Sequence, residues 1–179
     1  LLNIEIQDNG KIYTQQQEFT WGVLAINTNK SIYLSDEKAY LQMAALQDNG
    51  HTLCDANLIL QVKNPQFQVQ TFSTQDGTIQ KSGKCFGNNV TDMPDYFSYY
   101  QTGQTGVYKI ILILMADDGQ TELHRIDDSF EVWDSVPFDI ERIGPTRIYP
   151  PANYEMKFKI KANQDFSGEV KEHVPGSFL

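Results

Sequence analysis

The sequence has no apolar run of membrane-spanning length and little positive charge. Its longest apolar run, Ile110 to Ala116, is as long as a strand, whereas a spanning helix needs roughly 18 or more residues. The net charge of −9, from 14 basic and 23 acidic residues, argues against binding to a phosphate backbone and against charge-driven adhesion to anionic lipid. We therefore expect no nucleic-acid partner and no membrane-spanning segment.

The sequence also lacks a recognisable reaction centre. Its three histidines, His51, His124 and His173, have no Ser, Cys or Asp at a recognisable catalytic spacing. The acidic pairs at 117–118 and 127–128 are best explained as solvated acids at turns, because nothing in the sequence indicates the cleft that a glycosidase-type carboxylate pair needs. We predict a protein that is not an enzyme.

Cysteine is scarce, with only Cys54 and Cys85. Neither belongs to a Cys-x-x-Cys pair and no histidine lies at ligand spacing, which argues against a metal site. We expect one disulfide, which would stabilise the fold by roughly 3–4 kcal/mol for a loop of about 30 residues and would imply an oxidising compartment. Two separate buried thiols are the alternative. A reactive thiol in Ser82-Gly83-Lys84-Cys85 fits less well than half of a disulfide.

Nearly every periodic stretch has period two, and no stretch with period 3.6 reaches helix length. Alternating apolar rows occur at Ala39–Ala45, Leu58–Val62 and Phe67–Thr71, with turn signals every 8–12 residues. Val107–Met115 is apolar on both faces, as a central strand of a sandwich can be. These features predict an all-β protein with an immunoglobulin-like antiparallel β-sandwich.

The pattern divides the chain into three parts. Residues 1–19 are expected to be strands and a linker from a preceding β unit, and residues 20–135 a complete sandwich. Val136-Pro137 marks a boundary, after which Tyr154–Ile160 alternates cleanly without a partner sheet. Residues 136–179 are thus expected to begin a second, incomplete β-sandwich. We also expect the chain to be a fragment of a longer protein, because residues 1–6 start in mid-pattern and lack the features of a signal peptide.

A corner between two predicted strands carries the most specific motif. The motif is Thr28-Asn29-Lys30-Ser31-Ile32-Tyr33, and Gly106-Val107-Tyr108-Lys109-Ile110 follows later in the same unit. Both segments resemble the second domain of alpha-2-macroglobulin-type proteins, and the corner also resembles bacterial immunoglobulin-like repeats. The first resemblance implies a macroglobulin-like form of the sandwich. The resemblance covers about residues 22–134. Ser35-Asp36 departs from the family's Pro-Gly at the turn, and the thioester motif Cys-Gly-Glu-Gln is absent.

The irregular segment 82–94 suggests two kinds of surface site. Loops of a sandwich can gather oxygen ligands around Ca²⁺, and the best candidates here are Asn88, Asn89, Asp92 and Asp95. Apart from this calcium candidate, we expect no cofactor. The sequence also matches the N-glycosylation pattern at Asn29-Lys30-Ser31 and at Asn89-Val90-Thr91.

Aromatic residues offer a third kind of site. Tyr96, Tyr99, Tyr100 and Trp133 are candidates for carbohydrate stacking or for packing against a neighbouring domain. Trp133 is expected to point away from its own core, because Phe130 and Val132 occupy the inward positions of the same strand. Core packing is the simpler alternative for the tyrosines.

These expectations together favour a non-catalytic structural, adhesion or binding module of a larger extracellular or cell-surface protein. Its expected partners are neighbouring β domains of the same polypeptide, with another protein or a glycan as an additional partner. Two alternatives remain open, a macroglobulin-like protease-interacting protein and a carbohydrate-binding accessory domain of a secreted enzyme.

Overall fold

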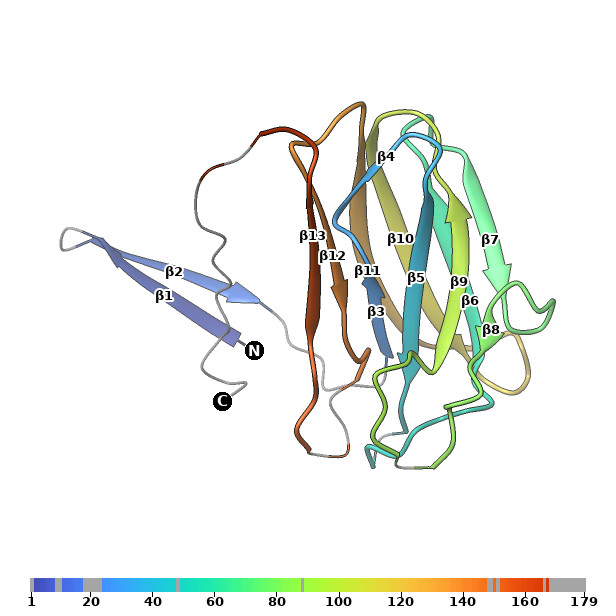
Figure 1. The fold of residues 1–179 in the computed structure, drawn as a ribbon. Coiled ribbons are helices and arrows are strands. Elements are labelled where there is room, and N and C mark those ends of the chain that lie inside the picture. Colours follow the sequence, from blue (N-terminus) through green and yellow to red (C-terminus); the bar gives the residue numbers. More distant parts are fainter. Residues whose placement is uncertain are drawn as a thin grey trace.

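β-Strands joined by turns and loops form the fold in a computed structural model (Figure 1), which describes residues 2–8, 11–17, 24–47, 49–87, 89–147, 150, 152–165 and 167. For 2–8 and 11–17 we describe the backbone only. Within this described part no helix is long and apolar enough to cross a membrane. The strands are β1 (Leu2–Asp8), β2 (Lys11–Gln17), β3 (Leu24–Thr28), β4 (Ile32–Leu34), β5 (Lys38–Ala45), β6 (Asn57–Lys63), β7 (Val69–Ser73), β8 (Gln80–Lys81), β9 (Tyr96–Gln101), β10 (Gly106–Met115), β11 (Glu122–Trp133), β12 (Phe138–Ile143) and β13 (Lys157–Ala162).

Two sheets form a sandwich. One has the order β3-β5-β9-β8, and the other has the order β4-β11-β10-β6-β7. All pairs are antiparallel except β4 with β11, which is parallel. Immunoglobulin-type sandwiches order their ABED and CFG sheets in the same way, and here an extra strand lies at each edge of the second sheet. The all-β sandwich is therefore confirmed, and its strand order agrees with the immunoglobulin-like prediction.

The core lies between the two sheets and follows the period of two. Alternate residues of β6 are buried, and the inward rows of β5 and β10 are buried together with some residues of their other faces; Leu41, Leu60 and Leu112 have zero exposure. Four rings, those of Tyr33, Tyr100, Tyr108 and Phe130, pack at one end of this core, and Tyr108 stacks on Phe130 with centroids 4.9 Å apart. Burial of each such side chain stabilises the fold by about 1.5–3 kcal/mol. The predicted inward rows of β5 and β6 are thus confirmed.

Strand β7 corrects one predicted row. Phe67 and Val69 are 76% and 54% exposed, and Phe72 is the buried residue of this strand. The turn after Asn64-Pro65 places Phe67 at a φ of 65°, so the ladder with β6 begins at Val69. Because side chains alternate between faces, a register one residue away from the expected one reverses the whole row.

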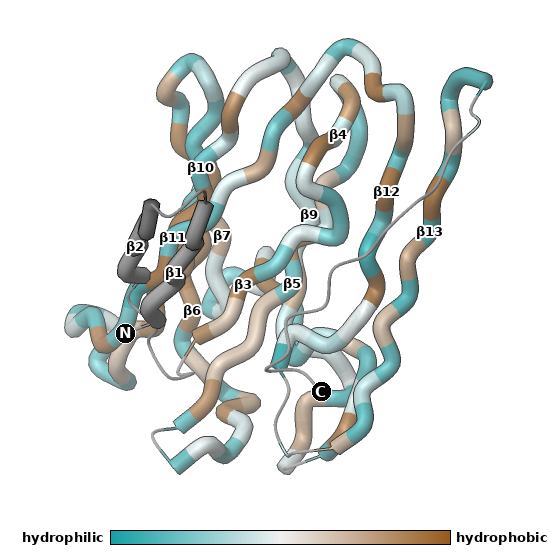
Figure 2. Tube along the Cα trace, turned by 90° about the vertical axis from the view of Figure 1, so that its left-hand side faces the viewer, coloured by the Kyte–Doolittle hydropathy of each residue, from teal (hydrophilic) through white to brown (hydrophobic). Residues whose placement is uncertain are grey.

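Two further hairpins do not belong to the two sheets of the sandwich. Strands β1 and β2 form a two-stranded sheet of their own, as do β12 and β13. Figures 1 and 2 both show the β12–β13 hairpin beside β3 and β5. Figure 2 also shows apolar segments along both strands of this hairpin. A two-stranded hairpin alone is marginally stable, so its contacts with the sandwich are expected to fix its position. The domain boundaries at 19/20 and 135/136 stay a prediction.

Candidate functional site

The corner motif connects the sandwich to the β12–β13 hairpin through Asn29. Its Oδ1 accepts hydrogen bonds from the Tyr33 hydroxyl (2.6 Å) and from the Tyr40 N–H (3.2 Å). Its Nδ2 donates to Glu141 Oε1 at 3.0 Å, and its carbonyl oxygen accepts from the Arg142 N–H at 2.9 Å. One side chain therefore fixes the chain where it changes sheets and also holds strand β12.

Lys30 makes the second contact between the sandwich and the β12–β13 hairpin. Its Nζ lies 3.2 Å from Glu37 Oε1 in the sandwich and 2.8 Å from Asp139 Oδ1 in β12. Burial alone would lower the pKa of Lys30, but hydrogen bonds to Asp139 and Glu37 outweigh it and raise that pKa above its usual value. The Lys30 side chain is only 14% exposed, so this cation is held between one carboxylate in the turn before β5 and one on β12.

The Ser35-Asp36 turn completes the corner without the family's Pro-Gly. Asp36 has a φ of 66°, a conformation that glycine adopts without steric cost and other residues disfavour. Glu37 stabilises the turn because its Oε2 accepts the Leu34 N–H at 3.0 Å. The departure from the family pattern therefore leaves the backbone turn in place.

A buried ion pair forms the third contact. Arg147 donates from Nε to Asp95 Oδ2 at 2.7 Å and from Nη2 to Asp95 Oδ1 at 3.2 Å. Their side chains are 2% and 0% exposed. Arg147 also donates to the carbonyl oxygen and the Oδ1 of Asn89, both at 2.9 Å. This two-pronged geometry is the strong form of an arginine–carboxylate pair.

The same ion pair corrects the calcium prediction. Asn89 and Asp95 do gather around a cation, but that cation is the guanidinium of Arg147. Asp92 is exposed and Asn88 lies outside the described residues. In the described part of the chain no group of three or more His, Cys, Asp or Glu residues is placed to hold a metal ion. This ion pair could not be predicted from the sequence because Arg147 lies 52 positions from Asp95.

Both asparagines of the glycosylation pattern are engaged within the fold. Asn29 uses its amide nitrogen to hold Glu141, and Asn89 Nδ2 donates to the Lys84 carbonyl at 2.7 Å. A glycosylated amide nitrogen keeps one N–H, so these bonds do not exclude a glycan at either position. Asn29 and Asn89 therefore stay predicted glycosylation sites.

The predicted disulfide between Cys54 and Cys85 is present. It ties the segment after β5 to the irregular segment before β9. Ser82, Cys85 and Asp95 are buried next to the sandwich, and the Ser82 N–H donates to the Asp95 carbonyl at 2.9 Å. The disulfide thus anchors the loop that also carries the acidic partner of Arg147.

The aromatic candidates separate into two groups. Tyr96 and Tyr100 are 1% and 7% exposed and belong to the core, so they are withdrawn as surface binding residues. Tyr99 is 51% exposed and stacks on Tyr40 with centroids 5.1 Å apart. Trp133 is 43% exposed and points outward as expected, with its Nε1 donating to Glu131.

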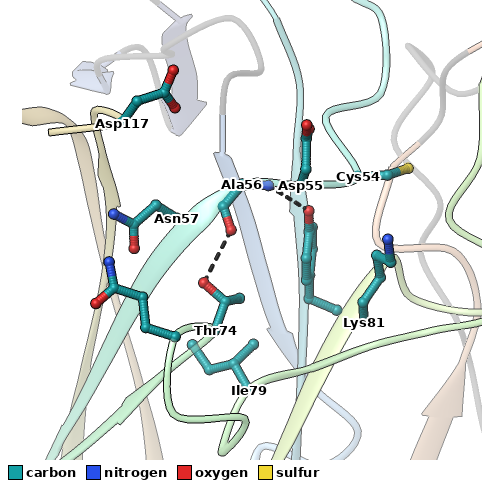
Figure 3. Close-up of a pocket in the computed structure, with 10 residues that line it drawn as sticks. Cys54, Asp55, Ala56, Asn57, Thr74, Ile79, Lys81 and Asp117 are labelled. Atoms are coloured by element: carbon teal, nitrogen blue, oxygen red, sulfur yellow. Dashed lines mark hydrogen bonds between the residues drawn. The ribbon is translucent and has the colours of Figure 1, made fainter. Parts of the chain in front are cut away.

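Tyr96 supports a shallow cavity of about 420 Å³ near the disulfide (Figure 3). The Ala56 N–H donates to the Tyr96 hydroxyl at 2.8 Å, and that hydroxyl donates to the Leu53 carbonyl at 2.7 Å. Thr74 Oγ1 donates to the Ala56 carbonyl at 3.0 Å. In Figure 3 the Cys54 side chain points away from the other residues. The bonded groups here hold the loop, and we assign no ligand to this cavity.

The Tyr96 phenol should make stability depend on alkaline pH. Burial raises the pKa of Tyr96 to about 12, against about 10 in the unfolded chain. The folded state then keeps the proton to higher pH, so the stabilisation is present below pH 10 and falls by on the order of 2–3 kcal/mol as the pH rises toward 12. Urea unfolding between pH 9 and 12 measures this. Tyr96→Phe should flatten the decline, and an unchanged slope in this variant would contradict the assignment.

A second cavity, the joint cleft, lies between the corner, β11 and the β12–β13 hairpin. Its volume is about 470 Å³, and its lining includes Ser31, Ile32, Asp128, Ile140, Arg142 and Phe158. The sandwich and the β12–β13 hairpin therefore both contribute residues to the walls of this cleft. The histidines take no part in either cavity, since His51 and His124 are exposed elsewhere and His173 lies outside the described residues.

Comparisons with known proteins add little. The chain matches no protein-family model and no curated protein. Among solved structures it is similar to the chitinase ChiW from Paenibacillus sp. str. FPU-7, a bacterial cell-surface-expressed multi-modular enzyme, with 12% identity and a TM-score of 0.40. The match covers 65% of this chain and 9% of that chain. A similarity at this level carries no argument about function.

Proposed function

We propose that this chain is a non-catalytic spacer module of a larger extracellular protein, and that it holds consecutive β units at a fixed angle. The finer relation to macroglobulin-type or bacterial immunoglobulin-like domains belongs to the same proposal. Adhesion or protease interaction would then depend on parts of the protein beyond this module. The disulfide supports an oxidising location, because such bonds persist outside the cytosol.

The observation that carries the proposal is the set of contacts at the two ends of the β12–β13 segment. At one end, Asn29 and Lys30 hold Glu141 and Asp139. At the other end, Arg147 is buried against Asp95. Contacts at two separated points restrict rotation, whereas a single flexible linker would leave neighbouring domains free to move. The arrangement is therefore suited to transmitting a fixed geometry along a chain of β domains.

Lys30→Met should loosen the contact between the β12–β13 hairpin and the sandwich without unfolding the sandwich. Lys30 contacts Glu37 and Asp139, whose side chains are 31% and 30% exposed, so we expect a stability loss of about 1 kcal/mol. The backbone ¹⁵N relaxation rates of β13 should report faster local motion in the variant, while those of β5 and β10 stay unchanged. In the wild type, all three strands should share one rotational correlation time.

Lys109→Met is the matched control, because Lys109 is exposed on β10 and makes no ion pair among the described residues. It should leave the relaxation rates of β13 unchanged. Independent tumbling of β13 in the wild type would refute the spacer function. Equal relaxation rates of β13 in the wild type and in Lys30→Met would show that Lys30 does not hold the β12–β13 hairpin against the sandwich.

A further inference from the structure

The joint cleft has an apolar wall on the hairpin. Ile140 pairs with Ile160 and Arg142 pairs with Phe158 across the two strands, so these four residues share one face. Ile140 and Phe158 line the cleft, yet they are 49% and 38% exposed. Neither side chain is closely packed in the fold. The phenyl ring of Phe158 therefore offers apolar surface to whatever enters the cleft.

Two charged groups of opposite sign also face the cleft. Asp128 lies on β11 and Arg142 on β12, and they attract each other, yet they form no ion pair among the described residues. Apart from the N–H of Ser129, which donates to Asp128 Oδ1 at 2.8 Å, no hydrogen-bond donor in the described chain reaches this carboxylate. Partial burial beside the neighbouring strands raises the pKa of Asp128, while the residue keeps exposed surface that a ligand can reach. An acceptor and a donor are thus both available across one cavity.

The charges restrict what the cleft can bind. The Asp128 carboxylate would repel an anionic ligand and Arg142 would repel a cationic one, whereas the charge of Lys30 is already compensated by Glu37 and Asp139. A neutral ligand rich in hydroxyl groups meets neither penalty, because hydroxyls donate to a carboxylate and accept from a guanidinium. The volume of about 470 Å³ lies within the range of about 300–1,000 Å³ for small-ligand sites, which occur preferentially at domain interfaces.

We propose that the joint cleft binds a short neutral oligosaccharide. Asp128 accepts hydrogen bonds from sugar hydroxyls, Arg142 donates to neighbouring hydroxyls, and the C–H face of a pyranose ring packs on Phe158. Ser31 adds a hydroxyl at the corner side of the cleft. This site is independent of the spacer function, since a rigid joint needs no ligand and a ligand can bind there whether or not the joint is rigid.

The test is a titration of the ¹⁵N-labelled protein with neutral hexasaccharides, namely those of β-1,4-glucose, β-1,3-glucose, α-1,4-glucose, β-1,4-xylose, β-1,4-mannose and β-1,4-N-acetylglucosamine. We expect at least one of them to shift the amide signals of Asp128, Ser129 and Arg142 in a saturable manner. Asp128→Asn, Arg142→Met and Phe158→Ala should each weaken that binding by about tenfold or more.

Phe67→Ala is the matched control, because Phe67 is an exposed phenylalanine on the far strand β7 side of the sandwich, and it should not change the affinity. All four variants change exposed side chains, and their circular dichroism spectra should match the wild type. The proposal is overturned if none of the six sugars shifts these amides at millimolar concentration, or if the variants bind as tightly as the wild type. Preferential binding of hexagalacturonate or of an extended peptide at the cleft would also overturn it.

Discussion

Replacing Arg147 with Met is expected to lower the free energy of unfolding by about 3–5 kcal/mol. Asp95 is fully buried, and Arg147 supplies both of its charged hydrogen bonds. Without the guanidinium, a carboxylate stays in the interior with no compensating charge, and that cost exceeds the loss of an attractive contact. Urea unfolding at pH 7, followed by circular dichroism, measures the change.

Arg125→Met is the matched control for this prediction. Arg125 makes a similar two-pronged pair with Glu122, but both side chains are 43% exposed. Such a surface pair contributes at most about 1 kcal/mol. In the double variant Asp95→Asn with Arg147→Met, part of the lost stability should return, because no buried charge remains. If Arg147→Met costs no more than Arg125→Met, then the pair does not anchor the segment after β12.

The second large effect concerns the disulfide. Converting both Cys54 and Cys85 to Ala should lower the free energy of unfolding by about 3–4 kcal/mol, because the bond closes a loop over a sequence separation of 31. The amide protons of residues 82–95 should also exchange faster, since the bond anchors this loop. Thermal unfolding and hydrogen exchange measure the two consequences.

Reductant serves as the control for the cysteine variant. Dithiothreitol should destabilise the wild type by a similar amount and should leave the double variant unchanged. Mass spectrometry of the native protein should find no free thiol. Two free thiols, or a wild-type unfolding midpoint that does not respond to reductant, would contradict the assigned bond.

The sandwich could be predicted from the sequence because its signals are local. Leu41 and Leu60 belong to rows of period two, and such rows specify which face of a strand is buried. The disulfide followed from the presence of two cysteines in a β-rich chain. Phe67 and Val69 gave a similar row but a wrong face, because a turn with a positive φ at Phe67 sets the register and nothing in the local pattern reveals it.

The contacts between the sandwich and the β12–β13 segment could not be predicted because they join residues far apart in sequence. Asn29 and Glu141 are separated by 112 positions, and Asp95 and Arg147 by 52. The family resemblance singles out the corner motif, but it does not indicate that Asn29 and Lys30 contact β12. Arg147 gave no local signal, since a single arginine after a Gly-Pro turn is ordinary. The calcium prediction included Asn89 and Asp95, but the cation that these two residues contact is the guanidinium of Arg147.

The central claim is that the sandwich and the β12–β13 hairpin form one rigid unit. The most direct measurement is the distance distribution between two spin labels, one at Lys109→Cys on β10 and one at Lys161→Cys on β13, by double electron–electron resonance. Both positions are exposed, so the labels should not disturb the fold. We predict a single narrow distribution that broadens in Lys30→Met. A broad distribution in the protein with Lys30 intact would contradict the account.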